Sequence, residues 1–145
     1  MSLYNVFNIT GTGMSAQSVR LNTTASNLAN AQTVASSVNE TYKARHPVFS
    51  AIFDDAFLDP DQRGAFDAEG GVRVMGIVES KAPYEMRYEP HHPMANEEGY
   101  VTYPNVNVVE EMTHMISSSR SYQMNVELMS TAKTCLLYTS PSPRD

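Results

Sequence analysis

Four histidines and one cysteine are the residues of this chain best suited to metal binding or nucleophilic chemistry. His91 and His92 are adjacent, and adjacent residues on a strand point to opposite faces, so both could reach one ion only from a turn. A zinc site would also need His46 or His114 as a further ligand. Three carboxylates lie nearby in the sequence: Glu89, Glu97 and Glu98. Solvated turn histidines explain this pattern more simply, so we expect no metal and no cofactor.

The cysteine and the aspartates form no recognisable catalytic or calcium-binding pattern. Cys135 with a histidine could make a nucleophile pair, but it lies in an unusual C-terminal tail. The aspartates between residues 54 and 67 lack the ligand spacing of a calcium-binding loop, so we interpret them as part of a solvated loop. No group of residues meets the requirements of an active site, and the sequence indicates a protein that is not an enzyme.

Charge is distributed very unevenly along the chain. Arg20 is the only charged residue from Met1 to Thr33, and segment 105–134 carries five charged residues. The segment between them, 34–104, contains twelve acidic and six basic residues, so the net charge of −6 originates there. An ordinary surface helix covers its outer face with charged residues. Ends covered instead with Ser, Thr, Asn and Gln suit contacts on several sides, including contacts with partner subunits.

Apolar residues at heptad spacing predict a helix in each end segment. The stripe in 3–31 is half polar in its second row, and the stripe in 105–134 covers about three heptads after the helix breaker Pro104. Asn107 followed by Glu110 fits a helix N-cap, and Asn30 fits a helix end, because Asn tolerates the left-handed conformation. Gly11 and Gly13 allow a close approach of another backbone or a bend. The expected helix-packing residues are Phe7, Met14, Leu21, Leu28, Met112, Met115, Tyr122 and Val126.

The middle of the chain has the pattern of a small antiparallel β unit. Residues 72–78 and 84–88 alternate in the way strands do, and 100–103 is a short third strand. Residues 54–71 are acidic and punctuated by glycine, which indicates an exposed loop. The expected fold is α+β: residues 1–33 and 105–134 pack as an antiparallel coiled coil, and residues 34–104 form a β-rich insertion.

Composition excludes several classes of partner. The chain is acidic and has no basic stripe to meet phosphates, so we expect no nucleic-acid partner. No apolar run approaches the length needed to cross a bilayer. A cleaved signal peptide is also missing, because no basic residue precedes Arg20 and no continuous apolar stretch follows. If the protein leaves the cytoplasm, we expect it to use another route.

Several runs of residues together resemble a known family. Arg20–Asn22, Ala25–Ala31 and Thr33 are similar to the N-terminal signature of the flagellar axial proteins, which form the rod, hook and hook-associated structures. Further runs are similar to the proximal-rod members of that family: Tyr88–Pro90, His92–Pro93, Gly99–Val101, Pro104–Val106, Val108–Met112, Ser119–Gln123 and Asn125–Val126. The resemblance covers about residues 1–134. It assigns Asn27, Ala29, Asn30 and Thr33 to the signature at the end of the first helix.

This resemblance implies a structural subunit of the proximal rod of the bacterial flagellar basal body. Such a subunit polymerises through its terminal helices, transmits torque and forms part of the export-channel wall. It would be exported by the flagellar type III apparatus without a cleaved signal and lie in the periplasm. Implied partners are FlgB, FlgF, FlgG, the base adaptor FliE and further copies of the chain. The alternatives are another axial family member, a cytoplasmic coiled-coil adaptor, or an enzyme with a zinc or cysteine site.

The C-terminal tail departs from the family pattern. Rod proteins of this kind continue the last helix past Lys133 with apolar and lysine residues, whereas this chain continues as residues 135–145. Pro141 and Pro143 would stop a helix. The run resembles vector- or adapter-derived translation, so we expect a non-native tail that is not part of the fold.

Overall fold

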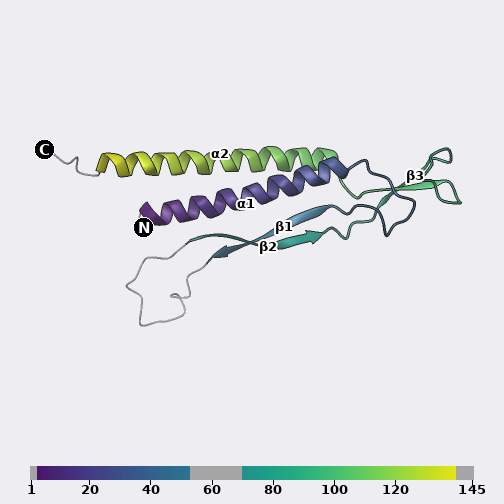
Figure 1. Cartoon of the computed structure of the whole chain (residues 1–145), viewed down its shortest axis with the longest axis horizontal. Helices are drawn as coiled ribbons and strands as arrows, with labels where there is room; N and C mark the ends of the chain where they lie inside the picture. Colours follow the sequence, from purple (N-terminus) through teal and green to yellow (C-terminus); the bar gives the residue numbers. More distant parts are fainter. Residues whose placement is uncertain (1–2, 53–69, 140–145) are drawn as a thin grey trace, which may run out of the picture. The chain divides into compact units, whose positions relative to one another are not determined.

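The computed structural model describes residues 3–52 and 70–139 and has an α+β fold, as the sequence predicts (Figure 1). Two long helices enclose four strands in the chain order. The elements are α1 Leu3–Asn30, β1 Arg45–Ile52, β2 Gly71–Glu79, β3 Glu85–Tyr88, β4 Tyr100–Tyr103 and α2 Val108–Thr139. Most of the predicted acidic loop at 54–71 lies outside the described residues. No helix in the described ranges is long and apolar enough to cross a membrane.

The strands form two separate two-stranded sheets. β1 pairs with β2, and β3 pairs with β4 in an antiparallel register that sets Glu85 opposite Tyr103 and Tyr88 opposite Tyr100. β2, β3 and β4 confirm the three strands predicted from alternation. β1 was not predicted, because Pro47 interrupts its run and its residues do not alternate between polar and apolar types.

The chain divides into two compact units. The first unit contains residues 1–18, 49–75 and 118–145, and the second contains 19–48 and 76–117. Both helices and the β1–β2 pair contribute residues to each unit. The two units are described separately below.

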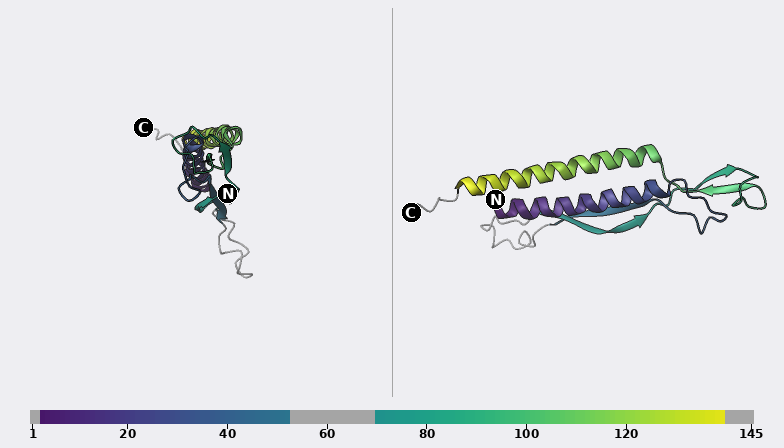
Figure 2. Two further views of the ribbon diagram at one scale, coloured as in Figure 1. Left: turned by 90° about the vertical axis from the view of Figure 1, so that its right-hand side faces the viewer. Right: turned by 45° about the horizontal axis from the view of Figure 1, so that its top comes forward.

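In the first unit, the early part of α1 lies beside the late part of α2 (Figure 2). A Cβ atom added to Gly13 would lie 3.0 Å from Asn125 Nδ2, so this glycine permits the close approach expected from the sequence. The same atom at Gly11 would meet nothing within 4 Å. The buried side chains of this unit are small or polar: Asn5, Thr10, Ala16, Ser118 and Ala132. Buried threonine is tolerated because its hydroxyl bonds to the helix, as when Thr10 Oγ1 donates to the Val6 carbonyl over 2.7 Å.

In the second unit, the β3–β4 pair is centred on Val101, which is fully buried. Thr102 continues the pairing to Ala35 through an isolated antiparallel bridge, which fixes the chain that follows α1. Gly99 has a φ of +83°, and a Cβ atom there would lie 2.8 Å from the Tyr88 ring. The turn between β3 and β4 therefore requires glycine at this position.

One end of each helix lies where the sequence predicts it: the start of α2 and the end of α1. Asn107 Oδ1 accepts the N–H groups of Val109 (3.1 Å) and Glu110 (3.4 Å), which confirms the N-cap of α2. α1 ends at Asn30 as predicted, but the stated reason was wrong, because no non-glycine residue in the described ranges has a positive φ. α2 continues to Thr139, five residues past the predicted segment 105–134. The expectation that the whole tail lies outside the fold is therefore wrong for residues 135–139. The origin of the tail stays a prediction.

Candidate functional site

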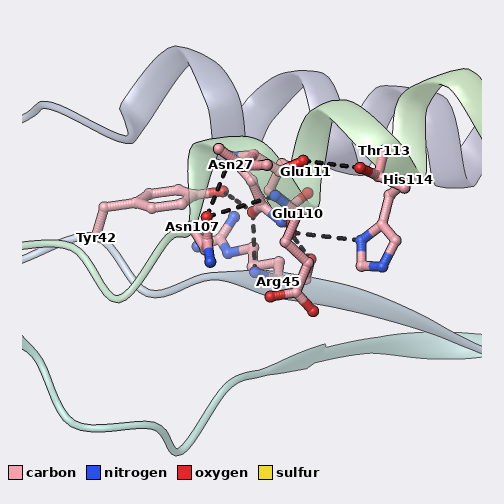
Figure 3. Close-up of polar contacts among 9 residues, drawn as sticks. Asn27, Tyr42, Arg45, Asn107, Glu110, Glu111, Thr113 and His114 are labelled. Carbon is pink, nitrogen blue, oxygen red and sulfur yellow. Dashed lines mark hydrogen bonds and ion pairs between the residues drawn. The ribbon is translucent and has the colours of Figure 1, made fainter.

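Asn27 is the centre of a buried polar cluster in the second unit (Figure 3). It is 1% exposed, and it lies on the face of α1 that meets β1 and α2. Its Nδ2 donates to the Arg45 carbonyl (2.8 Å) and to Glu111 Oε2 (3.1 Å). Its Oδ1 accepts the Arg45 N–H and the Tyr42 hydroxyl, each over 2.9 Å. The amide thus uses two donor and two acceptor positions, and only this orientation matches its neighbours.

These bonds join three segments that are far apart in the sequence. Asn27 bonds both the N–H and the carbonyl of Arg45, as a neighbouring strand would, and so attaches the start of β1 to α1. Its bond to Glu111 attaches the first turns of α2 to the same point. A buried polar group without a partner costs about 1–3 kcal/mol of stability. Any packing of the three segments that left one of these groups unpaired would therefore be less stable. We call Asn27, Tyr42, Arg45 and Glu111 the Asn27 junction.

Glu111 brings a buried carboxylate to the junction. It is 3% exposed, although it stands in the first turn of α2, where the helix dipole favours a negative charge. His114 Nδ1 lies 3.8 Å from Glu111 Oε1, which is an ion pair when the imidazole is protonated. The carboxylate thus accepts from the Asn27 amide through Oε2 and faces the imidazole through Oε1.

The surroundings of Tyr42 in the junction disfavour ionisation of its hydroxyl. Burial raises the pKa of the Tyr42 hydroxyl above its ordinary value, and the negative charges of Glu111 and Glu79 raise it further, while Arg45 opposes them. The Arg45 guanidinium lies 5.5 Å from the centre of the Tyr42 ring and 3.6 Å from Glu79 Oε1. A protonated hydroxyl is what the bond to Asn27 Oδ1 requires.

The remaining signature residues form the end of α1. Asn30 Nδ2 donates to the Ser26 carbonyl (2.8 Å), and the Asn30 carbonyl accepts from the Thr33 hydroxyl (2.8 Å) and N–H (3.1 Å). The two bonds from Thr33 satisfy the Asn30 carbonyl, which the helix end leaves without a partner in the helix. Ala29 is exposed. The signature thus contains one junction residue, two helix-ending residues and one surface residue.

A second amide, that of the half-buried Asn105, holds the loops beside the junction. Its Oδ1 accepts the Ala44 N–H over 2.8 Å, and its Nδ2 donates to the Ala82 carbonyl over 2.8 Å. In the sequence, Asn105 stands out only as part of a run of family resemblance. No local pattern marks Tyr42 or Arg45, because their contacts join segments that are distant in the sequence.

The predicted helix-packing residues differ in exposure between the two helices. Phe7, Met14, Leu21 and Leu28 of α1 are all half-buried. In α2, Met115 is half-buried, while Met112 is 53% exposed and Tyr122 and Val126 are also exposed. The buried positions of α2 are Glu111, Ser118 and Ala132, on a face adjacent to the predicted stripe. The role of the stripe in packing between chains stays a prediction.

The histidines and the cysteine form no metal centre in the described ranges, where no group of three His, Cys, Asp or Glu residues could hold an ion. His91 and His92 lie between β3 and β4, and His92 Nδ1 accepts the Met94 N–H over 3.1 Å. Cys135 is exposed on α2. The aspartates at 54–67 lie outside the described residues.

Comparison with known proteins gives matches at both ends and over nearly the whole chain. The family model "Flagella basal body rod protein" matches residues 7–34, and "Flagellar basal body rod FlgEFG protein C-terminal" matches residues 97–139. The chain is 46% identical over 139 residues to the flagellar basal-body rod protein FlgC of Salmonella typhimurium, with 96% of each chain covered. It is 44% identical over 139 residues to FlgC of Yersinia enterocolitica, again over 96% of each. FlgC of Borreliella burgdorferi is 32% identical over 145 residues, covering 92% of this chain and 93% of the relative.

Proposed function

This chain belongs to the FlgC family of flagellar basal-body rod proteins, and we propose that it polymerises through its terminal helices to build the proximal rod. It is a structural rod subunit of the flagellar basal body, and its family is not a class of enzymes. The proposal concerns how it assembles and what it contacts.

The observation that carries the proposal is the surface of the two helices. α2 leaves large apolar side chains in contact with solvent in the single chain, among them Val109 (73% exposed) and Ile116 (58% exposed). α1 has Arg20 as its only charged residue. Helices with so little charge and so much exposed apolar surface are unusual on a monomer and are typical of surfaces that other chains cover.

We assign residues 1–33 and 105–134 to the rod core, where the predicted stripe residues pack as a coiled coil between and within chains. Residues 34–104 form the insertion, and we assign residues 135–145 to a non-native tail. A rod requires a contact between unlike surfaces that does not close into a ring, so that successive subunits follow a helix. The core in this proposal forms the wall of the export channel and transmits torque.

The neighbours in this proposal are FlgB, FlgF, FlgG, FliE and other copies of the chain. The chain would reach the periplasm through the flagellar type III apparatus without a cleaved signal. The ends of the two helices would become ordered only when the chain joins neighbouring subunits. Burial of surface in the interface then offsets the loss of conformational entropy. Late ordering would discourage assembly in the cytoplasm.

Leu21→Asp tests the proposed seam. A charge buried in a packed apolar contact is strongly unfavourable, so we expect no rod and no swimming when this variant replaces FlgC in a flagellated host. Ser36→Asp adds the same charge at an exposed position after α1 and serves as the matched control. Swimming is measured in soft agar, and rods are counted in isolated basal bodies. Normal swimming of the Leu21→Asp strain would reject the seam assignment.

A further inference from the structure

We propose that a cleft beside the end of β2 binds the carboxylates of Glu97 and Glu98 from a second copy of this chain. The inference rests on the proposed function, because it supplies one contact between successive subunits. The cleft and the two glutamates both belong to the second unit. The cleft has a volume of about 330 Å³ and is lined by Lys43, Glu79, Ser80, Lys81, Ala82 and Tyr84.

The backbone around the cleft is held in place. Asn105 bonds the Ala82 carbonyl and the Ala44 N–H, and the Ala82 N–H donates to Ser80 Oγ over 3.2 Å. The Ser80 N–H also donates to the Ala44 carbonyl over 2.7 Å. A cleft whose walls are already fixed loses little conformational entropy when a ligand enters.

The cleft has positive charge that the single chain leaves uncompensated. Glu79 lies 4.0 Å from Lys43 Nζ and 3.6 Å from an Arg45 nitrogen, so its one negative charge is shared by two cations. Lys81 has no ion pair within residues 3–52 and 70–139. The Tyr84 hydroxyl is buried and has no hydrogen-bond partner in the same ranges. A carboxylate would pair with Lys81 and could satisfy this hydroxyl after a small rotation of the ring.

The chain itself carries two exposed carboxylates of complementary charge. Glu97 and Glu98 are exposed in the turn between β3 and β4 and form no ion pair within the described part of the chain. Asn96 Oδ1 accepts the N–H groups of Glu98 (3.1 Å) and Tyr100 (2.8 Å), so the turn presents both carboxylates from a fixed backbone.

Two different surfaces of opposite charge on one chain make a head-to-tail contact, which is the kind of contact that builds an open helix when the rotation between subunits does not close a ring. Each copy has a net charge of −6, so two copies repel one another in most orientations. A positive cleft on one copy favours the orientation in which it meets the glutamates of the other copy.

A cysteine pair tests the contact directly. Lys81→Cys and Glu98→Cys are introduced together in a Cys135→Ser background, expressed in a host that lacks FlgC, and oxidised in isolated basal bodies. Because every copy carries both cysteines and the contact repeats, we expect a ladder of disulfide-linked species at two or more times the chain mass from the pair and none from either single variant. Linkage in the Lys81→Cys single variant, linkage to a different protein, or no linkage from the pair would overturn the inference.

Charge reversal gives a second, independent readout. Lys81→Glu replaces attraction by repulsion at an exposed position, so we expect roughly a tenfold loss of assembled protein, with unchanged thermal stability of the free chain. Adding Glu97→Lys and Glu98→Lys should restore most of the loss. A triple variant no better than Lys81→Glu would overturn the inference. Failure of the unsubstituted chain to restore swimming would instead reject the proposed function.

Discussion

The buried amides of the Asn27 junction and of the early part of α1 differ in whether their hydrogen-bonding groups have partners. Asn27 has four hydrogen bonds, which use both of its acceptor and both of its donor positions. In the first unit, Asn5 Nδ2 and Gln17 Oε1 are buried and have no partner in the described part of the chain. A single copy therefore satisfies the Asn27 amide of the second unit but leaves two buried amides of the first unit unsatisfied. Under the proposed function, a neighbouring subunit completes them.

The largest effect should come from Asn27→Ala, because it removes every bond that holds the three segments of the junction together. The Arg45 N–H and carbonyl and the Glu111 carboxylate would all lose a buried partner, so we expect the free energy of unfolding to fall by about 3 kcal/mol. Urea denaturation of the purified chain measures this loss.

Asn22→Ala is the control, because Asn22 is an exposed asparagine of the same helix and should change stability by less than about 0.5 kcal/mol. Equal effects of the two substitutions would contradict the description of Asn27 as the centre of the junction.

Gln17→Met tests the unsatisfied amides of the first unit. It should raise the stability of the free chain, whereas Asn27→Ala should lower it. Methionine has nearly the same shape and removes a buried group that lacks a partner, so we expect the free chain to gain about 1 kcal/mol and some helix content. The same change should reduce assembly, since the bond that a neighbour supplies is lost. Gln123→Met, at an exposed position of α2, is the matched control. A free chain destabilised by Gln17→Met would show that the amide is already satisfied.

The smallest effect concerns pH at the junction. The pKa of Tyr42 is raised in the folded chain, chiefly by burial, above its ordinary value of 10.0. Its contribution to stability is therefore fully present below pH 10 and is lost as the pH rises through the folded pKa. We expect the stability difference between the chain and Tyr42→Phe, about 1 kcal/mol at neutral pH, to shrink above pH 10. A difference that is constant from pH 8 to pH 11.5 would argue against this bond.

Local patterns in the sequence predicted the helices and three of the four strands, since alternation and capping residues act over a few positions. β1 was not predicted, because Pro47 interrupts its run. The strand is also held by hydrogen bonds to Asn27, which is distant in the sequence. The heptad stripe of α2 selected Met112 and Val126, which are exposed, whereas Glu111 and Ser118 are buried. A buried face made of small and polar residues cannot be found from hydrophobicity. Asn27 was identified through family resemblance, but its partners required the structure.

Far-ultraviolet circular dichroism of the free chain and of assembled rods tests the central claim most directly. We expect the free chain to keep its helix around the Asn27 junction but to have much less helix than the 28 residues of α1 and 32 residues of α2 would give, and to gain the rest on assembly. A stable monomer that already has this full helix content would contradict the claim that neighbouring subunits complete the helical ends.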